Sequence, residues 1–227
     1  MSNDAKPNPA PTKSLRFAER IAERAAQGIK SERTQARLQA AVCTLLETTL
    51  PSDLKVADIC RAEGVAHGTF YVYFRDIRHI LSETLTAFVG FMQVIMRRAA
   101  REGDGSDGVR RTTAAYVALF EQNAGLMRCL VTRMDDLPEA AVAFEKLNRE
   151  WTDTVVMARQ RRLSREDKAG LIEREELLRR AHALGGMVDQ YLIMLLFGRD
   201  STLADISRDR DAVINTLTLI WERGMEP

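Results

Sequence analysis

The chain has 227 residues, of which 45% are hydrophobic and 29% charged, a composition ordinary for a soluble globular protein that can bury a core without disulfides or metals. The formal net charge is +1, so overall charge does not point to nucleic acid, although residues 1–100 carry 14 basic against 10 acidic side chains and residues 101–227 carry 19 against 22. Glycines and prolines are few, and stretches rich in Ala, Leu, Arg and Glu favour an all-α fold.

The three cysteines, Cys43, Cys60 and Cys129, are far apart and have neither a CxxC pair nor the Cys/His spacing of a zinc site. We therefore expect no metal, no cofactor and a reducing, cytoplasmic location. No apolar run of about 18 residues predicts a membrane span. Residues 1–13 are polar and contain three prolines, so they lack the apolar centre of a signal peptide.

Apolar residues at helical spacing predict the elements in chain order. The expected divisions are a basic arm over residues 1–30, disordered or partly helical, a helix-turn-helix domain over 31–80 and a helical domain over 81–227. Within the first two, we expect helices over 14–30, from Ser31 to about Pro51, over 56–63 and 67–74, and after Asp76. A glycine-rich loop over 103–108 precedes further helices over 109–123, 125–135, 138–163, 173–197 and 209–223.

The most informative stretch runs from Val56 to Phe74. Two short helices joined by a tight turn with one glycine, Gly64, follow the plan of a helix-turn-helix. We expect Gly64 to reverse the chain at positive φ. The side chains expected to form a small core between these helices and the preceding one are Ile59, Ala62, Val65, Phe70 and Phe74.

The outer face of the second short helix carries short, polar or aromatic residues. They are His67, Gly68, Thr69, Tyr71, Val72 and Tyr73. This set suits a helix whose N-terminal end enters the major groove of DNA while its flank meets phosphates. The same shape also occurs in proteins that never touch DNA, in which the tyrosines could pack on another domain.

The segment resembles the N-terminal domain of the tetracycline-repressor (TetR) family of transcriptional regulators. The matching residues are Ile59-Cys60, Ala62-Glu63-Gly64-Val65-Ala66 and Gly68-Thr69-Phe70-Tyr71-Val72-Tyr73-Phe74. The detailed resemblance covers about residues 31–90, and the rest agrees in length, helix count and ending. It implies an all-α protein in which a three-helix, helix-turn-helix DNA-binding domain precedes a helical ligand-binding and dimerisation domain.

Three positions depart from the family's pattern. Lys55 stands where the first helix of the motif usually opens with Thr or Ser, Ala57 replaces a basic residue, and Ile77 replaces a lysine. Arg75 and Arg78 flank Ile77, and either could supply the lost phosphate contact. These replacements leave open which residues contact the DNA phosphates.

The resemblance and the exposed set together give the expected DNA-contacting residues: Lys55, His67, Gly68, Thr69, Tyr71, Tyr73, Arg75 and Arg78. His67 could donate to a base edge or a phosphate, or it could only begin the helix and face water. Gly68 lets the backbone approach DNA closely, and Thr69 offers a hydroxyl and a methyl group. Tyr71 takes the position of the family's phosphate-contacting tyrosine, whereas Tyr73 could lie half in the core.

In the TetR family the last two long helices pair with their copies in a four-helix bundle, which here corresponds to residues 173–197 and 209–223. The first carries an apolar stripe too wide for a helix covered on one side only. Its members are Leu177, Leu178, Ala181, Leu184, Gly185, Val188, Leu192, Leu195 and Leu196, and the second stripe holds Val213, Leu217, Ile220 and Trp221. We expect a homodimer through residues 173–223, unless both stripes serve the core of one protomer.

The resemblance also implies a pocket between the middle helices. Candidate lining residues are Phe120, Met127, Met134, Phe144, Trp151, Met157, Met187 and Tyr191. Methionines and aromatics at this spacing also form plain cores. An apolar lining would favour an apolar or aromatic effector.

Together these features predict a ligand-responsive transcriptional regulator, expected to be a repressor, that binds a palindromic operator in double-stranded DNA as a homodimer and is released by a small, apolar effector. The alternative is a helical protein-interaction module with a degenerate helix-turn-helix. An enzyme is not expected, because the sequence has no Gly-rich phosphate loop after a strand, no His-Glu-x-x-His and no nucleophile elbow.

Overall fold

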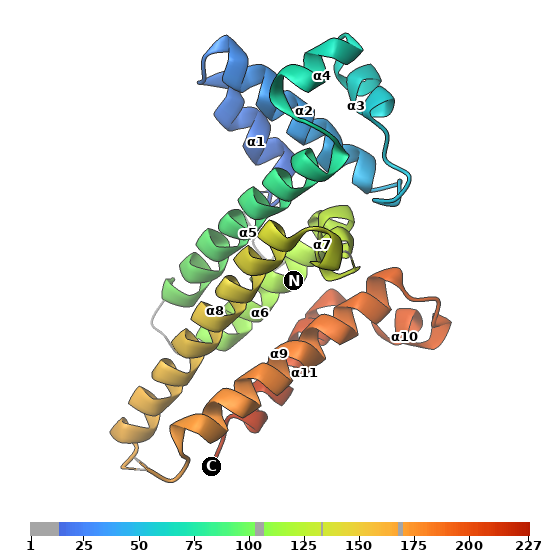
Figure 1. Ribbon diagram of the computed structural model, residues 1–227. Coiled ribbons are helices and arrows are strands. Elements are labelled where there is room, and N and C mark those ends of the chain that lie inside the picture. The colour runs from blue at the N-terminus through green and yellow to red at the C-terminus, as the bar shows by residue number, and fades with distance from the viewer. Residues whose placement is uncertain (1–13, 103–106, 133, 168–169) are drawn as a thin grey trace, which may run out of the picture.

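The computed structural model describes residues 14–102, 107–132, 134–167 and 170–227, without the side chains of Thr132 and Met134. Every regular element in these ranges is helical, which confirms the predicted all-α fold. Figure 1 shows an upper part built from the first four helices and a lower part built from the later ones. The long helix α5 (Ile77–Arg101) runs from one part into the other.

The upper part surrounds one small core. Its helices are α1 (Phe17–Ala26), α2 (Lys30–Leu46), α3 (Val56–Glu63) and α4 (His67–Tyr73). Leu38 and Leu46 of α2 and the predicted core residues Ile59, Phe70 and Phe74 are fully buried there. The prediction for Ala62 is wrong, because Ile59 and Cys60 fill the face of α3 that packs against α2 and leave Ala62 exposed at its margin.

The first helix is fixed to the rest of the molecule by ring contacts and by hydrogen bonds. The ring of Phe17 lies 5.4 Å from the ring centroids of both Phe88 and Phe91 in α5. The backbone N–H of Phe17 donates to Asn123 Oδ1 at 2.7 Å, and Asn123 Nδ2 donates back to Leu15 O at 2.9 Å. Residues 14–30 of the predicted arm are therefore packed against the rest of the molecule. Residues 1–13 of the arm are outside the described ranges.

The lower part contains the remaining helices. They are α6 (Gly108–Gln122), α7 (Ala124–Thr132), the 3₁₀ turn η1 (Met134–Asp136), α8 (Pro138–Arg165), α9 (Arg174–Phe197), α10 (Ser201–Ile206) and α11 (Arg210–Gly224). The predicted helix over 125–135 is divided between α7 and η1. The sequence analysis missed α10, which is too short for a periodic pattern; Asp200 caps it by accepting from the N–H groups of Thr202 and Leu203.

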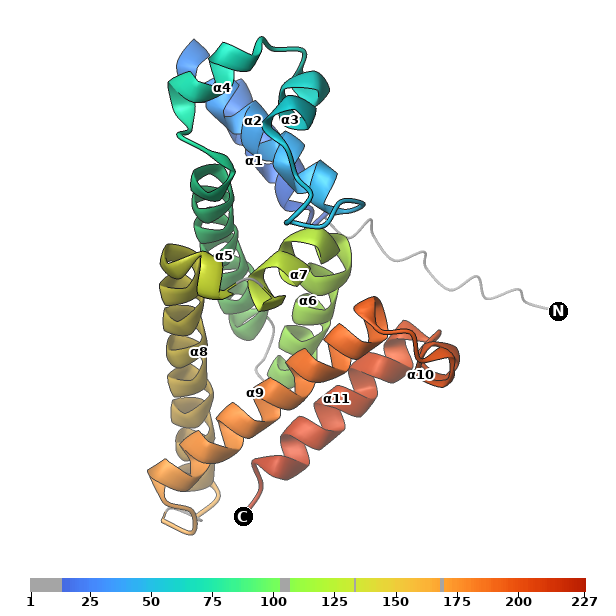
Figure 2. The same cartoon turned by 45° about the vertical axis from the view of Figure 1, so that its right-hand side comes forward.

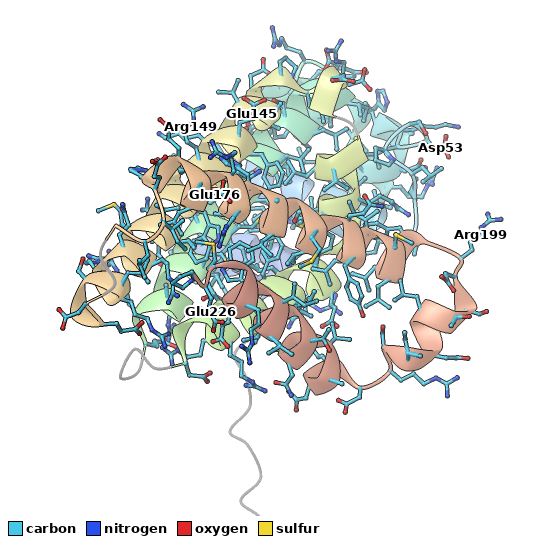
Figure 3. All side chains as sticks on the ribbon, turned by 90° about the horizontal axis from the view of Figure 1, so that it is seen from below. Asp53, Glu145, Arg149, Glu176, Arg199 and Glu226 are labelled. Carbon is cyan, nitrogen blue, oxygen red and sulfur yellow. The ribbon has the colours of Figure 1, made fainter. Side chains whose placement is uncertain are left out.

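Two of these helices, α9 and α11, lie side by side on one flank of the lower part (Figure 2). The view from below in Figure 3 shows Glu176 and Glu226 toward one end of this pair and Arg199 beyond the other. Arg180 links the two at the first end, because its Nε donates to Glu176 Oε1 at 2.9 Å and its Nη1 to Glu226 O at 2.6 Å. The chain's last residues are therefore held against α9.

A second junction between the upper and lower parts lies where α7 meets the C-terminal end of α2. A Cβ added to Gly125 would lie 2.3 Å from Leu46 O, so only glycine fits there. Arg128 Nη2 donates to Leu46 O at 3.0 Å and to Thr49 O at 3.3 Å. The guanidinium carbon of Arg128 also lies 5.9 Å from the ring centroid of Phe197, the last residue of α9.

Apolar residues of α5 and all three cysteines are buried inside the molecule. By length and composition alone α5 could cross a membrane, but Leu85, Phe88 and Met92 are fully buried against neighbouring helices. Cys43, Cys60 and Cys129 are buried thiols. Burial raises the pKa of Cys43 to about 12.

Candidate DNA interface and effector cavity

Helices α3 and α4 form the predicted helix-turn-helix. The turn depends on Gly64, which has φ +62°, a left-handed conformation that L side chains rarely adopt. The N–H of Val65 then returns to Cys60 O at 3.0 Å. The expected reversal at Gly64 is confirmed, and it directs α4 across the end of α3.

Helix α4 has one buried and one open side. Phe70 is fully buried, whereas His67, Gly68 and Tyr71 are exposed. The rings of His67 and Tyr71, one turn apart, meet edge to face with their centroids 5.4 Å apart. Tyr73 and Thr69 are half-buried. The open surface of α4 therefore begins at its N-terminal end and continues along the flank that carries Tyr71.

The basic residues predicted to contact DNA differ in whether their side chains are engaged within the protein. Lys55 precedes α3 and Arg75 precedes α5; both are exposed, and within the described part of the chain neither forms an ion pair. Arg78 is engaged, because its Nη2 donates to Asp136 O at 2.8 Å. Arg78 thus joins the upper part to η1 instead of projecting alone.

A cavity of about 690 Å³ lies among α5, α6, α8, α9 and α11 in the lower part. This volume is within the roughly 300–1,000 Å³ typical of small-molecule sites. Much of its wall is apolar, with Met92, Met96, Trp151, Val155, Val188 and Trp221 among the lining residues. Both tryptophans of the chain line it.

Two of the polar side chains that line the cavity are hydrogen-bonded to each other. Tyr116 of α6 donates its hydroxyl to Asp189 Oδ1 of α9 at 2.6 Å. Burial raises the pKa of Asp189, and the hydrogen bond from Tyr116 opposes this shift. Burial and the neighbouring carboxylate raise the pKa of Tyr116 well above its usual value. The pair therefore has a neutral phenol that donates to the carboxyl group.

The mouth of the cavity is formed by exposed charged residues near the ends of α8 and α11. They are Arg161, Arg162, Arg165, Glu222 and Glu226. Arg162 Nε donates to Glu166 Oε1 at 2.9 Å. The lining of the cavity thus includes both apolar side chains and exposed charged side chains.

The predicted pocket residues mostly lie elsewhere. Of the seven whose side chains the structure describes, Trp151 alone lines this cavity. Phe120, Met127 and Phe144 are buried in the core, Met187 and Tyr191 are half-buried on α9, Met157 is exposed, and the side chain of Met134 lies outside the description. The cavity lies nearer the C-terminal end of α8, whereas Phe120 packs beside Phe197 at the other end of α9.

Sequence reasoning missed Tyr116 and Asp189. A signal was present, since Asp189 is the one carboxylate within the apolar run Gly185–Phe197. An acidic residue among Leu, Val, Met and Tyr side chains in a helix is expected to have a partner or a function, because a buried carboxylate is costly when it has neither.

The wide apolar stripe of α9 belongs largely to the protomer itself. Leu177, Ala181, Val188 and Leu192 are buried, and Gly185 lines the cavity. On α11 the second stripe also divides, as Val213 and Leu217 are buried, Trp221 lines the cavity and Ile220 is exposed. The outward surface of this helix pair instead carries Gly186, Gln190, Met194, Thr216, Leu219 and Ile220.

A helix-turn-helix followed by one long helix that enters a helical body with an internal cavity is the fold of TetR-family transcriptional regulators. No protein-family model matches the sequence, and no curated protein matches it by sequence. The likeness is therefore one of structure.

Three solved structures illustrate this structural similarity. The TetR-family regulator PfmR from Thermus thermophilus has a TM-score of 0.63 at 16% identity, covering 84% of this chain and 99% of its own. A TetR-family regulator from Bordetella parapertussis has a TM-score of 0.60 at 18% identity, covering 90% and 93%. FadR from Bacillus subtilis, solved with stearoyl-CoA, has a TM-score of 0.62 at 14% identity, covering 84% and 98%. At these identities the likeness establishes the fold.

Proposed function

We propose that the protein is a cytoplasmic, ligand-responsive transcriptional repressor that binds a palindromic DNA operator as a homodimer and is released by a small effector with an apolar body. The observation that carries the proposal is the course of α5. Three residues separate this helix from α4, and Met92, Met96 and Ala100 farther along it line the cavity. A ligand in the cavity therefore contacts the same helix that follows the DNA-facing helix.

Effector and DNA would then oppose each other because each favours a different conformation of the dimer. A change in the course of α5 alters the spacing between the two helix-turn-helix units of a dimer. If effector and operator favour different spacings, each weakens the binding of the other. The complex of FadR with stearoyl-CoA shows that this fold can hold a large ligand in another protein.

The open end of α4 would enter the major groove. In this proposal His67 and Thr69 contact base edges, Gly68 allows close backbone approach, and the phosphate contacts come from Tyr71, Lys55 and Arg75. Tyr73 and Arg78, being partly buried or engaged with Asp136, contribute less directly. Phosphate contacts release counterions, so binding should weaken steeply with salt.

The sequence preference is tested by selection from randomised DNA with the wild type and His67→Ala. We expect the wild type to select a palindrome and His67→Ala to lose preference at one base pair in each half-site, at a cost of about 1–3 kcal/mol for each lost contact. Tyr71→Phe is the matched comparison, since loss of a phosphate hydrogen bond should weaken all sequences alike, by about 0.5–1.5 kcal/mol.

Two outcomes would contradict parts of this proposal. Identical preferred sequences for the wild type and His67→Ala would leave His67 as a solvent-facing residue and shift sequence reading to Thr69 and Gly68. A wild-type protein that selects no sequence and shifts no fragment of its own upstream DNA in a gel would favour the protein-interaction alternative.

The dimer is tested on the outward face of α9 and α11. Leu219 is 54% exposed on α11, its neighbour in sequence Ile220 is 40% exposed, and Met194 on α9 is 44% exposed, so this helix pair presents several large apolar side chains to solvent. We expect Leu219→Glu to shift the mass measured by light scattering from that of a dimer to the monomer's 25.6 kDa and to weaken operator binding at least tenfold.

Val142→Glu is the matched control, because Val142 is an exposed apolar residue of α8, 65% accessible, away from the α9–α11 face. It should leave both mass and operator binding unchanged. A monomeric wild type, or a Leu219→Glu variant that remains dimeric, would count against dimerisation through residues 173–223.

A further inference from the structure

The polar pair inside the cavity is incompletely satisfied by the protein. Asp189 Oδ1 accepts from Tyr116, and in the described part of the chain the carboxylate has no second hydrogen bond. It also forms no ion pair with a described Lys, Arg or His side chain. Asp189 is half-buried and lines the cavity, so water can reach its second oxygen when the cavity is empty, and a ligand that displaces this water has to supply a donor in its place.

The arginines that line the cavity do not fill this role. Arg159 Nε donates to Met225 O at 2.8 Å, and Arg162 Nε donates to Glu166. Arg161 and Arg165 are exposed at the mouth, on the stretch of α8 farthest from Leu147 and Trp151. Their charges are in contact with solvent and are screened there.

The space beside Asp189 is open. Gly185 lies one helical turn before Asp189 on α9, and both residues line the cavity. A Cβ added to Gly185 would meet no heavy atom within 4 Å. A ligand group therefore has room next to the carboxylate without displacing a protein side chain.

We propose that the effector is an amine, protonated at neutral pH, whose ammonium group binds Asp189 while its apolar body lies against Met92, Trp151 and Trp221. This inference rests on the proposed function and adds the chemical class of the effector. An ammonium group supplies both the missing hydrogen-bond donor and the missing positive charge. The apolar walls then enclose the remainder of the molecule.

The test compares three probes with the same apolar chain: decylamine, decanol and decanoate, each below the concentration at which it forms micelles. Both tryptophans line the cavity, so the fluorescence of the full-length protein reports its occupancy. We expect decylamine to bind about tenfold or more tightly than decanol or decanoate, because hydrogen bonds to charged groups are the stronger ones. Asp189→Asn, which keeps the shape and can still accept from Tyr116, should abolish this preference.

Three further variants locate the effect. Glu222→Gln removes a carboxylate at the mouth and should leave the preference for decylamine intact. Gly185→Val fills the space beside Asp189 and should weaken all three probes, whereas Gly90→Val, at an open and exposed position in α5, should weaken none. These variants keep the question answerable if Asp189→Asn does not fold.

Several outcomes overturn the inference. They are tighter binding of decanoate, which would place the polar end of the ligand at the arginines of the mouth, equal binding of all probes, binding of none, or a preference for decylamine that survives Asp189→Asn. None of these outcomes contradicts the proposed function as a transcriptional regulator if the same preparation binds DNA with sequence preference in the selection experiment. Failure of that selection would instead overturn the proposed function.

Discussion

Gly68→Glu should abolish operator binding without destabilising the protein. Gly68 is the second residue of α4 and is exposed, and a Cβ there would meet no heavy atom within 4 Å. A carboxylate in the first turn of a helix is favoured by the helix dipole, by about 0.3–1 kcal/mol. Against DNA phosphates the same charge costs several kcal/mol, so affinity should fall roughly a hundredfold or more. Fluorescence anisotropy with the selected operator and urea unfolding measure the two quantities.

Gly90→Glu is the matched control, since Gly90 is also an exposed helical glycine with open surroundings, but lies on α5. It should bind the operator like the wild type. If Gly68→Glu binds equally well, the N-terminal end of α4 does not enter the groove. The proposed contacts of His67 and Thr69 with bases are then contradicted as well.

The second large effect is expected at Gly125, where α7 abuts α2. A Cβ there would lie 2.3 Å from Leu46 O and 2.7 Å from Glu47 N, and both are backbone atoms that cannot rotate away. Gly125→Ala should therefore push α7 off the end of α2 and disturb the hydrogen bonds from Arg128 to Leu46 and Thr49. We expect the free energy of unfolding to fall by roughly 3 kcal/mol, the upper end of ordinary overpacking.

Gly90→Ala provides the comparison in urea unfolding, because it is the same substitution at a helical glycine but the added Cβ meets no obstacle at position 90. That variant should be more stable than the wild type by up to about 1 kcal/mol. Equal stability of the two variants would show that α7 does not rest on the backbone of α2.

The upper part was largely predictable because its determinants are local. The bounds of α3, the reversal at Gly64 and the burial of Phe70 and Phe74 all follow from spacing within about twenty residues. The contacts of Arg78 and Arg128 were not predictable, since their partners Asp136 and Leu46 are distant in sequence and are backbone carbonyls, which leave no trace in residue type.

The cavity was harder to predict for a different reason. Apolar residues that line a cavity and those that fill a core follow the same helical period, so Phe120 and Trp151 were indistinguishable in the sequence. The width of the stripe on α9 was ambiguous in the same way, because it covers both the protomer's own core and one wall of the cavity. Polar residues inside apolar runs, such as Asp189, were the more informative signal.

The burial of all three native thiols makes the chain a convenient background for distance measurements. Ile29, in the turn between α1 and α2, is 67% exposed. Ile29→Cys would place one accessible thiol on each protomer, and a two-fold dimer would carry a symmetric pair of spin labels after a single modification. Pulsed dipolar spectroscopy of that pair would give the separation of the two helix-turn-helix units with and without DNA or ligand, without a prior step to remove Cys43, Cys60 or Cys129.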